Sequence, residues 1–573
     1  MPENMRWRAA DRLLAAALLL ATAGFTMWQN TRVAVLWDLS YLLDSAWRFS
    51  LGQIPYREMP FAHAPLTFLL HAELVRIFGR VYLPHIWCAA LEAGIATVLT
   101  WRILRGLAAT EPGASGAAWL WSVLLALPLV FVGIYGIYPH PIYDSDAALA
   151  VLLGLYLLQK AEVGSSRRTA FAAGAVCVLP LFFKQNIGLA FLAAVLAYGA
   201  VGAIWAAKQK QDSAPLRWLL AGVVAGLLTA LALLQSWAGL QNYFYWTVTF
   251  AAQRRMPGAA LLIGTYRQHS LLWTIPASLA GAALLRWNRV RRRDLDAAAW
   301  LLLIAPFLWV LLSLPFTTDA DDRADQLLGL WPHLLLLSAL LAITNLRPQV
   351  LARGRLFPAL LPWILLATIH GAFLSQQLWG STYAMWPLLM LLLWGLLQPA
   401  RRIAGPLAIA VSGTLVICGA AYAISLERLD YIHREGPEVR ASLPALRGIA
   451  TPGPALPQLE KLVDATNSEI PRGDGILPIP GEVPFFFTTG RVPRFPILLF
   501  DPATDPYSPQ ETLLQARSHG IRWLIVSRNP QLAQPALANL DDVVRVLETE
   551  FELQRSISGY DIYRRRNRDA GSR

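Results

Sequence analysis

Residues 216–238 read LRWLLAGVVAGLLTALALLQSWA and contain one charged side chain, Arg217. A helix of about 20 such residues crosses the hydrocarbon core of a bilayer, because each residue advances a helix by about 1.5 Å. The segments on either side, 187–206 and 268–286, have the same character. The stretch therefore predicts a polytopic α-helical membrane protein.

The composition of the whole chain agrees with a membrane environment. Of the 573 residues, 55% are hydrophobic and 15% are charged, and the mean hydropathy is +0.43, which is more apolar than is usual for soluble domains. The net charge of +12 comes from short basic clusters between apolar runs, a pattern that argues against nucleic acid as a partner. The three cysteines lie inside apolar runs, so the sequence offers no disulfide framework and no cysteine-based metal site.

About thirteen apolar runs are candidates for transmembrane helices. A further run, 65–78, contains His71, Glu73 and Arg76, and we expect it to be an interfacial helix. The basic clusters then all fall on one side, as the positive-inside rule requires. The runs are 12–28, 83–105, 117–138, 142–160, 169–183, 187–206, 216–238, 268–286, 297–315, 326–344, 356–374, 382–398 and 404–424, and the basic clusters lie at 6–12, 102–105, 167–168, 208–210, 286–293, 347–355 and 401–402.

This topology predicts a multi-pass protein of the bacterial inner membrane whose acidic loops and C-terminal tail face the periplasm. The N-terminus has the basic region, the apolar region and the A-x-A-like step at 21–23 that are typical of a signal peptide. The apolar run continues to Trp28, which favours an uncleaved anchor. With either outcome the next segment starts outside the cytoplasm.

The composition changes at about residue 426 to that of a soluble α/β domain. The sequence SPQE at 508–511 is a capping box that predicts a helix start, Gly520 closes the helix, and IRWLIVS at 521–527 is a predicted strand. We therefore divide the chain into a transmembrane domain, 1–425, and a periplasmic domain, 426–573.

The first exterior loop contains many polar side chains close to the membrane. Apolar residues after Asp38 recur at helical spacing, which predicts an amphipathic helix lying on the membrane. Asp38 is a candidate general base toward a hydroxyl, and a helix N-cap is the alternative. Asp44 and Tyr56 are candidates for acceptor binding, although a solvated position on the helix also explains Asp44.

The second exterior loop is short and presents Tyr143, Asp144 and Asp146 at the mouth of two spans. These side chains are candidates for binding a sugar hydroxyl or an acceptor. Each aspartate could equally cap the helix that follows, because Asp is a favoured N-cap residue.

Four cations are candidates for binding a lipid-linked phosphate. Lys184 lies between two apolar runs, where an ionisable side chain is costly, and snorkelling to the headgroups is its alternative role. Arg254, Arg255 and Arg267 follow an aromatic stretch that is suited to a polyprenyl tail. The same loop also fits an aromatic belt whose arginines contact lipid phosphates.

Two histidines are candidates for a divalent metal site. His63 and His269 would form it if the first and third exterior loops converge. Ordinary hydrogen bonding is the alternative for each of them. No other cofactor is required.

These landmarks, in this order and on this side of the membrane, resemble the GT-C superfamily, in particular its branch with protein O-mannosyltransferases and the lipid A aminoarabinose transferase. The resemblance covers about residues 10–285 and then fades into a matching number of spans and a periplasmic C-terminal domain. It rests on Asp38, the Pro-led helix 65–79, Asp144, Lys184 and His269.

The resemblance implies inverting transfer of a sugar from a polyprenyl phosphate to a hydroxyl of a lipid, glycan or protein acceptor at the periplasmic face. Asp38 would take the acceptor proton, and Lys184 with the third-loop arginines would stabilise the leaving phosphate. This chain has Leu39 where the family has a second acid, and His63 and Ala64 where the aminoarabinose transferase has an acidic residue and Lys. These departures leave metal binding and the donor sugar open.

Two other functions fit a polytopic protein. A transporter or flippase of lipid-linked sugars is expected to have charges at span centres and inverted repeats, which this sequence does not show clearly. A non-catalytic scaffold that presents the C-terminal domain would tolerate replacement of Asp38 and Lys184. The glycosyltransferase hypothesis is favoured because the costly ionisable groups concentrate at one membrane face.

Overall fold

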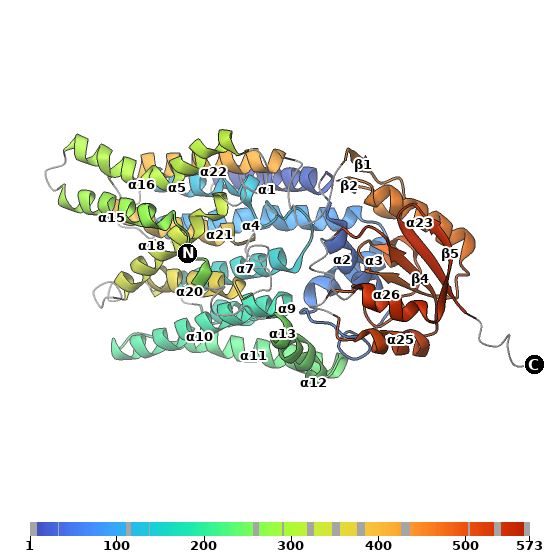
Figure 1. Ribbon diagram of the computed structural model, residues 1–573. Coiled ribbons are helices and arrows are strands. Elements are labelled where there is room, and N and C mark those ends of the chain that lie inside the picture. The colour runs from blue at the N-terminus through green and yellow to red at the C-terminus, as the bar shows by residue number, and fades with distance from the viewer. Residues whose placement is uncertain are drawn as a thin grey trace, which may run out of the picture.

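The computed structural model describes the chain in fourteen segments, which form a helical bundle with an α/β domain at one end (Figure 1). They are residues 9–32, 34–109, 116–136, 138–164, 166–255, 263–288, 292–317, 326–346, 356–374, 384–400, 402–425, 436–501, 505–531 and 540–566. Part of the topology prediction, including the basic cluster 347–355, lies outside the described residues.

The first part of the chain is helical throughout. Its elements are α1 (Ala9–Asn30), α2 (Leu36–Ser50), α3 (Leu66–Phe78), α4 (Leu83–Ala109), α5 (Gly116–Ala126), α6 (Leu129–Val132), α7 (Tyr143–Gly164), α8 (Arg167–Val176), α9 (Leu179–Phe183), α10 (Gln185–Lys208), α11 (Ala214–Trp237), α12 (Leu240–Phe244), the π-helix η2 (Tyr245–Phe250), α13 (Ala251–Arg255), α15 (Leu271–Trp287), α16 (Arg293–Ser313), η3 (Leu314–Phe316), α18 (Leu330–Asn345), α20 (Leu356–Ala372), α21 (Trp386–Leu397), η5 (Gln398–Ala400) and α22 (Ala404–Ile424).

Eight helices in the described residues are long and apolar enough to cross a membrane, and four shorter apolar helices accompany them. The predicted run 169–183 is divided into α8 and α9. Pro180 lacks the N–H that would continue the α8 hydrogen-bond ladder, which explains the break. Large apolar side chains on the outer faces are exposed, among them Leu272 and Phe316 at 78% and 84%, as a lipid environment favours. The polytopic helical fold is confirmed.

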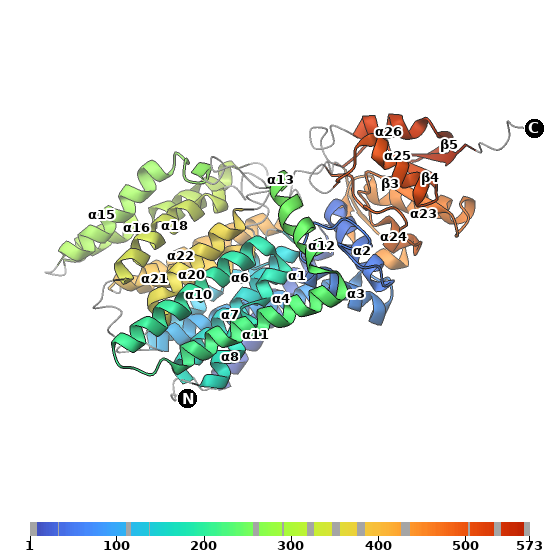
Figure 2. The same ribbon diagram turned by 90° about the horizontal axis from the view of Figure 1, so that it is seen from below.

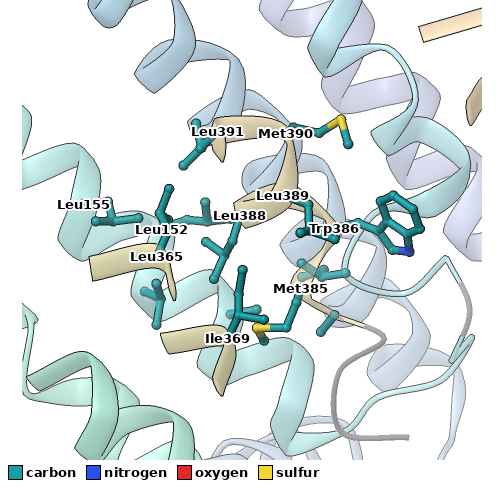
Figure 3. Packing of buried hydrophobic residues seen from close by; sticks show 14 of the residues in the cluster. Leu152, Leu155, Leu365, Ile369, Met385, Trp386, Leu388, Leu389, Met390 and Leu391 are labelled. Atoms are coloured by element: carbon teal, nitrogen blue, oxygen red, sulfur yellow. The ribbon is translucent and has the colours of Figure 1, made fainter. Parts of the chain in front are cut away.

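The centre of the bundle is built around α21. Its sequence WPLLMLLLWGLL has no charged residue, and a helix that is apolar on every face belongs in a core. Figure 3 shows Leu388 of α21 close to Leu152 of α7 and Leu365 of α20. These helices therefore form the packed apolar centre of the membrane part.

The second part of the chain forms the C-terminal α/β domain. A four-stranded sheet has the order β3-β4-β6-β5, in which β3 and β4 are parallel and the other pairs are antiparallel. The elements are β1 (Glu438–Arg440), η6 (Pro444–Leu446), β2 (Ala450–Pro452), α23 (Ala455–Glu469), β3 (Gly475–Ile479), α24 (Phe485–Thr489), α25 (Pro509–Ser518), β4 (Ile521–Ser527), α26 (Leu540–Glu548), β5 (Phe551–Ile557) and β6 (Tyr560–Arg565).

Local signals in this domain are confirmed. Ser508 and Glu511 form both hydrogen bonds of the capping box at the start of α25. Gly520 has φ +64 after the helix, and β4 follows over the predicted residues. The predicted boundary at 425/426 falls between α22 and β1, and residues 426–435 lie outside the described part of the chain.

The two helices that follow α1 in the chain, α2 and α3, lie between the bundle and the C-terminal domain (Figures 1 and 2). Leu39 and Leu43 of α2 belong to a cluster with Phe485 and other residues of the C-terminal domain, whereas Leu42 and Phe49 pack into the bundle cluster. The expectation that the apolar face of α2 lies on lipid is therefore wrong. Protein covers this helix on both sides, because its apolar residues are too widely spread around the axis for one contact surface.

Asp44 joins α2 to the C-terminal domain. The oxygens of its buried carboxyl group accept the backbone N–H groups of Phe486 at 3.2 Å and Phe487 at 2.7 Å, at the start of α24. Burial raises the pKa of Asp44 to about 8, against the lowering effect of these hydrogen bonds. The solvated-face interpretation of Asp44 is wrong, because the C-terminal domain covers the carboxylate and supplies its hydrogen-bond donors.

Neighbouring contacts strengthen the same junction. The Trp47 indole N–H donates to the Arg491 carbonyl at 2.9 Å, and the buried Arg48 guanidinium donates to the Pro496 carbonyl at 2.9 Å. Arg80, beyond α3, donates to the Phe487 carbonyl at 2.7 Å. The C-terminal domain is thus attached by specific polar contacts of α2 and of Arg80, which follows α3.

The raised pKa of Asp44 predicts a pH dependence of stability. The folded state keeps the Asp44 proton up to about pH 8, whereas the unfolded chain loses it near the ordinary pKa of 3.8, so stability falls as pH rises through this window. Asp44→Asn removes the titration at nearly constant size. We expect the apparent Tm in detergent to fall more between about pH 5 and pH 8 in the wild type than in this variant. Parallel profiles would contradict a protonated Asp44.

Candidate active site

Three predicted polar landmarks meet where the bundle adjoins α2. Asp38 is in the first turn of α2, Asp144 is in the first turn of α7, and Lys184 occupies the turn between α9 and α10. The backbone of Lys184 is extended, with φ −148 and ψ 116, which separates the two helices. Residues far apart in sequence therefore form one polar cluster at one end of the bundle.

Lys184 and Asp144 form a buried ion pair. Lys184 Nζ lies 2.5 Å from Asp144 Oδ1, and both side chains are less than a tenth exposed. The ammonium also lies 4.8 Å from the centroid of the Tyr143 ring, within the range of a cation–π contact. The snorkelling interpretation of Lys184 is wrong, because the side chain points into the protein. The Asp144 carboxylate binds this cation at the start of α7.

Asp38 lies beside this pair and is accessible. Its Oδ2 atom is 3.8 Å from Nε2 of the buried His140, and 24% of its side chain is exposed. Its charge acts electrostatically on Asp144. The N-cap of α2 is Val35 and not Asp38, so the capping interpretation of Asp38 is wrong. A partly exposed carboxylate beside a histidine is suited to accept a proton.

Aromatic rings cover one side of the cluster. The His63 ring stacks on Tyr143 with centroids 4.7 Å apart and meets Tyr41 edge-on at 5.2 Å. The Tyr56 hydroxyl donates to the His63 carbonyl at 2.6 Å, and Tyr56 is buried with φ +67. Tyr56 thus holds the loop that carries His63, while Tyr143 lies directly against Lys184.

The predicted pair Asp144 and Asp146 is divided between two environments. Two residues along a helix turn the side chain by about 200°, so the two carboxylates face different neighbours. Asp146 accepts a hydrogen bond from Thr67 Oγ1 at 2.5 Å and contacts Tyr135, whose hydroxyl donates to Glu92 at 2.7 Å. Asp146 thus belongs to a buried network that joins α3, α4 and α7.

Gln185, the first residue of α10, connects the segment after α11 to the cluster. Its side-chain N–H group donates to the Ala62 carbonyl at 2.9 Å and to the Thr247 carbonyl at 3.4 Å. Thr247 lies in the π-helix η2, a rare geometry that is frequent at functional sites. The segment before α3 and the segment after α11 therefore converge at Gln185.

The residues predicted to bind phosphate or metal in the segment after α11 are described only in part. Of these, Arg267 and His269 are exposed. The side chains of Arg254 and Arg255 lie outside the described residues. Within the described part of the chain, no group of three or more His, Cys, Asp or Glu side chains is arranged to hold a metal ion. His63 is packed among aromatic rings.

Three residues that the sequence did not single out have partners at the site or beside it. His140 lies against Asp38, Gln185 connects two loops, and Glu92 shares a buried network with Asp146. His140 had a detectable signal, because Pro139 and Pro141 flank it and restrict the backbone around it. Glu92 gave a weaker one as a carboxylate inside an apolar run.

Comparisons with known proteins return solved structures only. No family model and no curated protein matches the chain. The chain is similar to ArnT from Cupriavidus metallidurans bound to undecaprenyl phosphate, with 13% identity, TM-score 0.43 and coverage of 98% of this chain and 99% of that chain. It is similar to the apo oligosaccharyltransferase from Archaeoglobus fulgidus, with 12% identity, TM-score 0.49 and coverage of 97% and 75%.

The Lys184–Asp144 ion pair predicts that substitutions of these two residues have strongly coupled effects on the free energy of unfolding. Lys184→Met leaves Asp144 buried without its cation, and we expect a loss of about 3–5 kcal/mol. The double variant Lys184→Met/Asp144→Leu removes both buried charges and should recover most of this loss. Thermal unfolding of the wild type, both single variants and the double variant gives the coupling energy. Losses that simply add would contradict a direct ion pair.

Proposed function

We propose that this protein is a membrane glycosyltransferase that moves a sugar from a polyprenyl-phosphate donor to a hydroxyl acceptor at the periplasmic face of the bacterial inner membrane. The observation that supports it is the meeting of Asp38, Asp144 and Lys184 at one end of the bundle, beside aromatic rings. One accessible carboxylate next to a cation is the minimum that this reaction requires.

In the proposed reaction Asp38 is the general base. Its carboxylate takes the proton of the acceptor hydroxyl while that oxygen attacks the anomeric carbon of the donor sugar. The bond from this carbon to the phosphate oxygen breaks, and the electron pair leaves with polyprenyl phosphate. Attack opposite the leaving group inverts the anomeric configuration. His140, whose Nε2 atom lies 3.8 Å from Asp38 Oδ2, is the proposed positioning residue for this carboxylate.

The leaving group needs cations and not an acid, because a phosphate departs as a stable anion. Lys184 is the proposed point charge for this phosphate, assisted by Arg254, Arg255 and Arg267. Asp144 already binds Lys184, so an arriving phosphate would compete with this carboxylate for the ammonium. Such competition would weaken binding of the product lipid and favour its release.

Fewer residues are proposed to bind the sugar or the acceptor than the sequence suggested. Tyr143 and Asp144 lie at the cluster and are proposed to bind the sugar or the acceptor. Asp44, Tyr56 and Asp146 have buried structural partners, so we assign them supporting roles in place of acceptor binding. The acceptor class is a lipid, glycan or protein hydroxyl, and no metal takes part in the proposed steps.

Substitution of the base tests the reaction. We expect Asp38→Asn to lower kcat by about 10²- to 10⁴-fold, because the amide cannot accept the proton. The assay follows radiolabelled sugar from polyprenyl phosphate into a membrane-extract acceptor. Asp464→Asn, an exposed change in α23, is the matched control and should keep wild-type activity.

The outcomes separate the hypotheses. Full activity of Asp38→Asn would remove Asp38 from the mechanism. If the wild type moved the donor lipid across proteoliposome membranes and transferred no sugar, it would be a transporter or flippase. This outcome would contradict the proposal.

The periplasmic orientation has a separate test. Glu58 is exposed in the first exterior loop, and Arg168 is exposed at the start of α8, on the opposite side in the proposed topology. A membrane-impermeant thiol reagent added to spheroplasts should label Glu58→Cys and should label Arg168→Cys only after lysis. Cys177 and Cys418 are buried and Cys88 is partly buried, so the wild type gives the background. The reverse labelling pattern would place the cluster in the cytoplasm.

A further inference from the structure

A large cavity lies in the bundle away from the candidate active site. It is lined by residues of α15, α16, α18, α21, η5 and α22 and has a volume of about 750 Å³. Leucine and alanine side chains make up most of its wall. Ser278 and the buried His333 form a polar pair in the wall, with 3.3 Å between Oγ and Nε2.

The cavity lies toward the opposite end of the membrane part. His269, a landmark of the candidate site, precedes α15, whereas the cavity follows this helix from Ser278 to Arg286 near its far end. This stretch is about 12 Å long at 1.5 Å per residue. Figure 1 places the end of α15 and the start of α16 remote from the C-terminal domain. The cavity is therefore distinct from the polar cluster around Asp38.

The walls favour a hydrocarbon occupant. Leu279 and Leu340 line the cavity and are each 47% exposed, so the cavity opens on the lipid-facing side of the bundle. Water finds few hydrogen-bond partners along such a wall, and an empty space of this size forfeits dispersion contacts. An acyl chain satisfies both constraints.

The end of the cavity near the last turn of α15 favours an anionic headgroup. Arg286 and Arg402 both line the cavity at its polar end and are exposed. Arg402 Nη1 donates to the Asn288 carbonyl at 2.7 Å, which ties α15 to the segment before α22. The nearby Asp296 is bound by the Asn288 amide at 2.9 Å. Guanidinium groups at the end of an apolar groove between membrane helices match a lipid phosphate.

We propose that this cavity binds an anionic membrane phospholipid. An acyl chain lies along α15 and α18, and the phosphate contacts Arg286 and Arg402. The site is independent of the donor site proposed above, since it lies toward the other end of the bundle and shares no residue with it.

The test compares lipids that differ only in headgroup. Native mass spectrometry of the purified protein in detergent measures retention of phosphatidylglycerol, of phosphatidylcholine with the same chains, and of inorganic phosphate. We expect phosphatidylglycerol to bind at least about 10-fold more tightly than phosphatidylcholine, and inorganic phosphate not to be retained. Equal retention of both lipids, or retention of inorganic phosphate alone, would overturn the proposal.

Two variants separate the charges from the cavity. Arg286→Gln/Arg402→Gln should lose the headgroup preference, whereas Arg168→Gln/Arg217→Gln removes two exposed arginines elsewhere and should keep it. Ala282→Trp fills the cavity with the arginines intact and should lower retention about 10-fold, while Ala221→Trp on the exposed face of α11 should not. Unchanged lipid binding in both Arg286→Gln/Arg402→Gln and Ala282→Trp, with folding verified by gel filtration, would place the lipid elsewhere.

Discussion

The ion pair between Lys184 and Asp144 is the interaction on which the candidate site depends. A charge buried at this depth must be compensated, and each of these groups has the other at 2.5 Å. The pair fixes the start of α7 against the turn between α9 and α10. It thereby places Tyr143 beside the ammonium and Asp144 beside Asp38, so the geometry of the polar cluster follows from one electrostatic requirement.

The second constraint is the position of α2 between the bundle and the C-terminal domain. Asp38 occupies the first turn of this helix, and Asp44, about 1.7 turns later, binds the start of α24. The C-terminal domain therefore takes part in holding the proposed base in position. The helix is covered by protein on both faces, which makes it a more rigid support than a helix resting on lipid would be.

Much of the fold was predictable, because it depends on local patterns. Apolar runs predicted the membrane helices, and the capping box at 508–511 with Gly520 predicted α25 and its end. The site was predictable in part. Asp38, Asp144 and Lys184 were identified as costly polar groups near one membrane face, but Asp44 and Asp146 were assigned to acceptor binding, and the structure gives both buried partners from distant segments.

The sequence by itself determined that this chain spans a membrane many times and carries a separate α/β domain, because hydropathy, helix length and capping act within a few residues of one another. Only the tertiary structure decided which carboxylates meet a cation, which are covered by the C-terminal domain, and that His140 lies against Asp38. These contacts join residues tens to hundreds of positions apart. No local pattern specifies such contacts, since they arise from the packing of whole helices and domains.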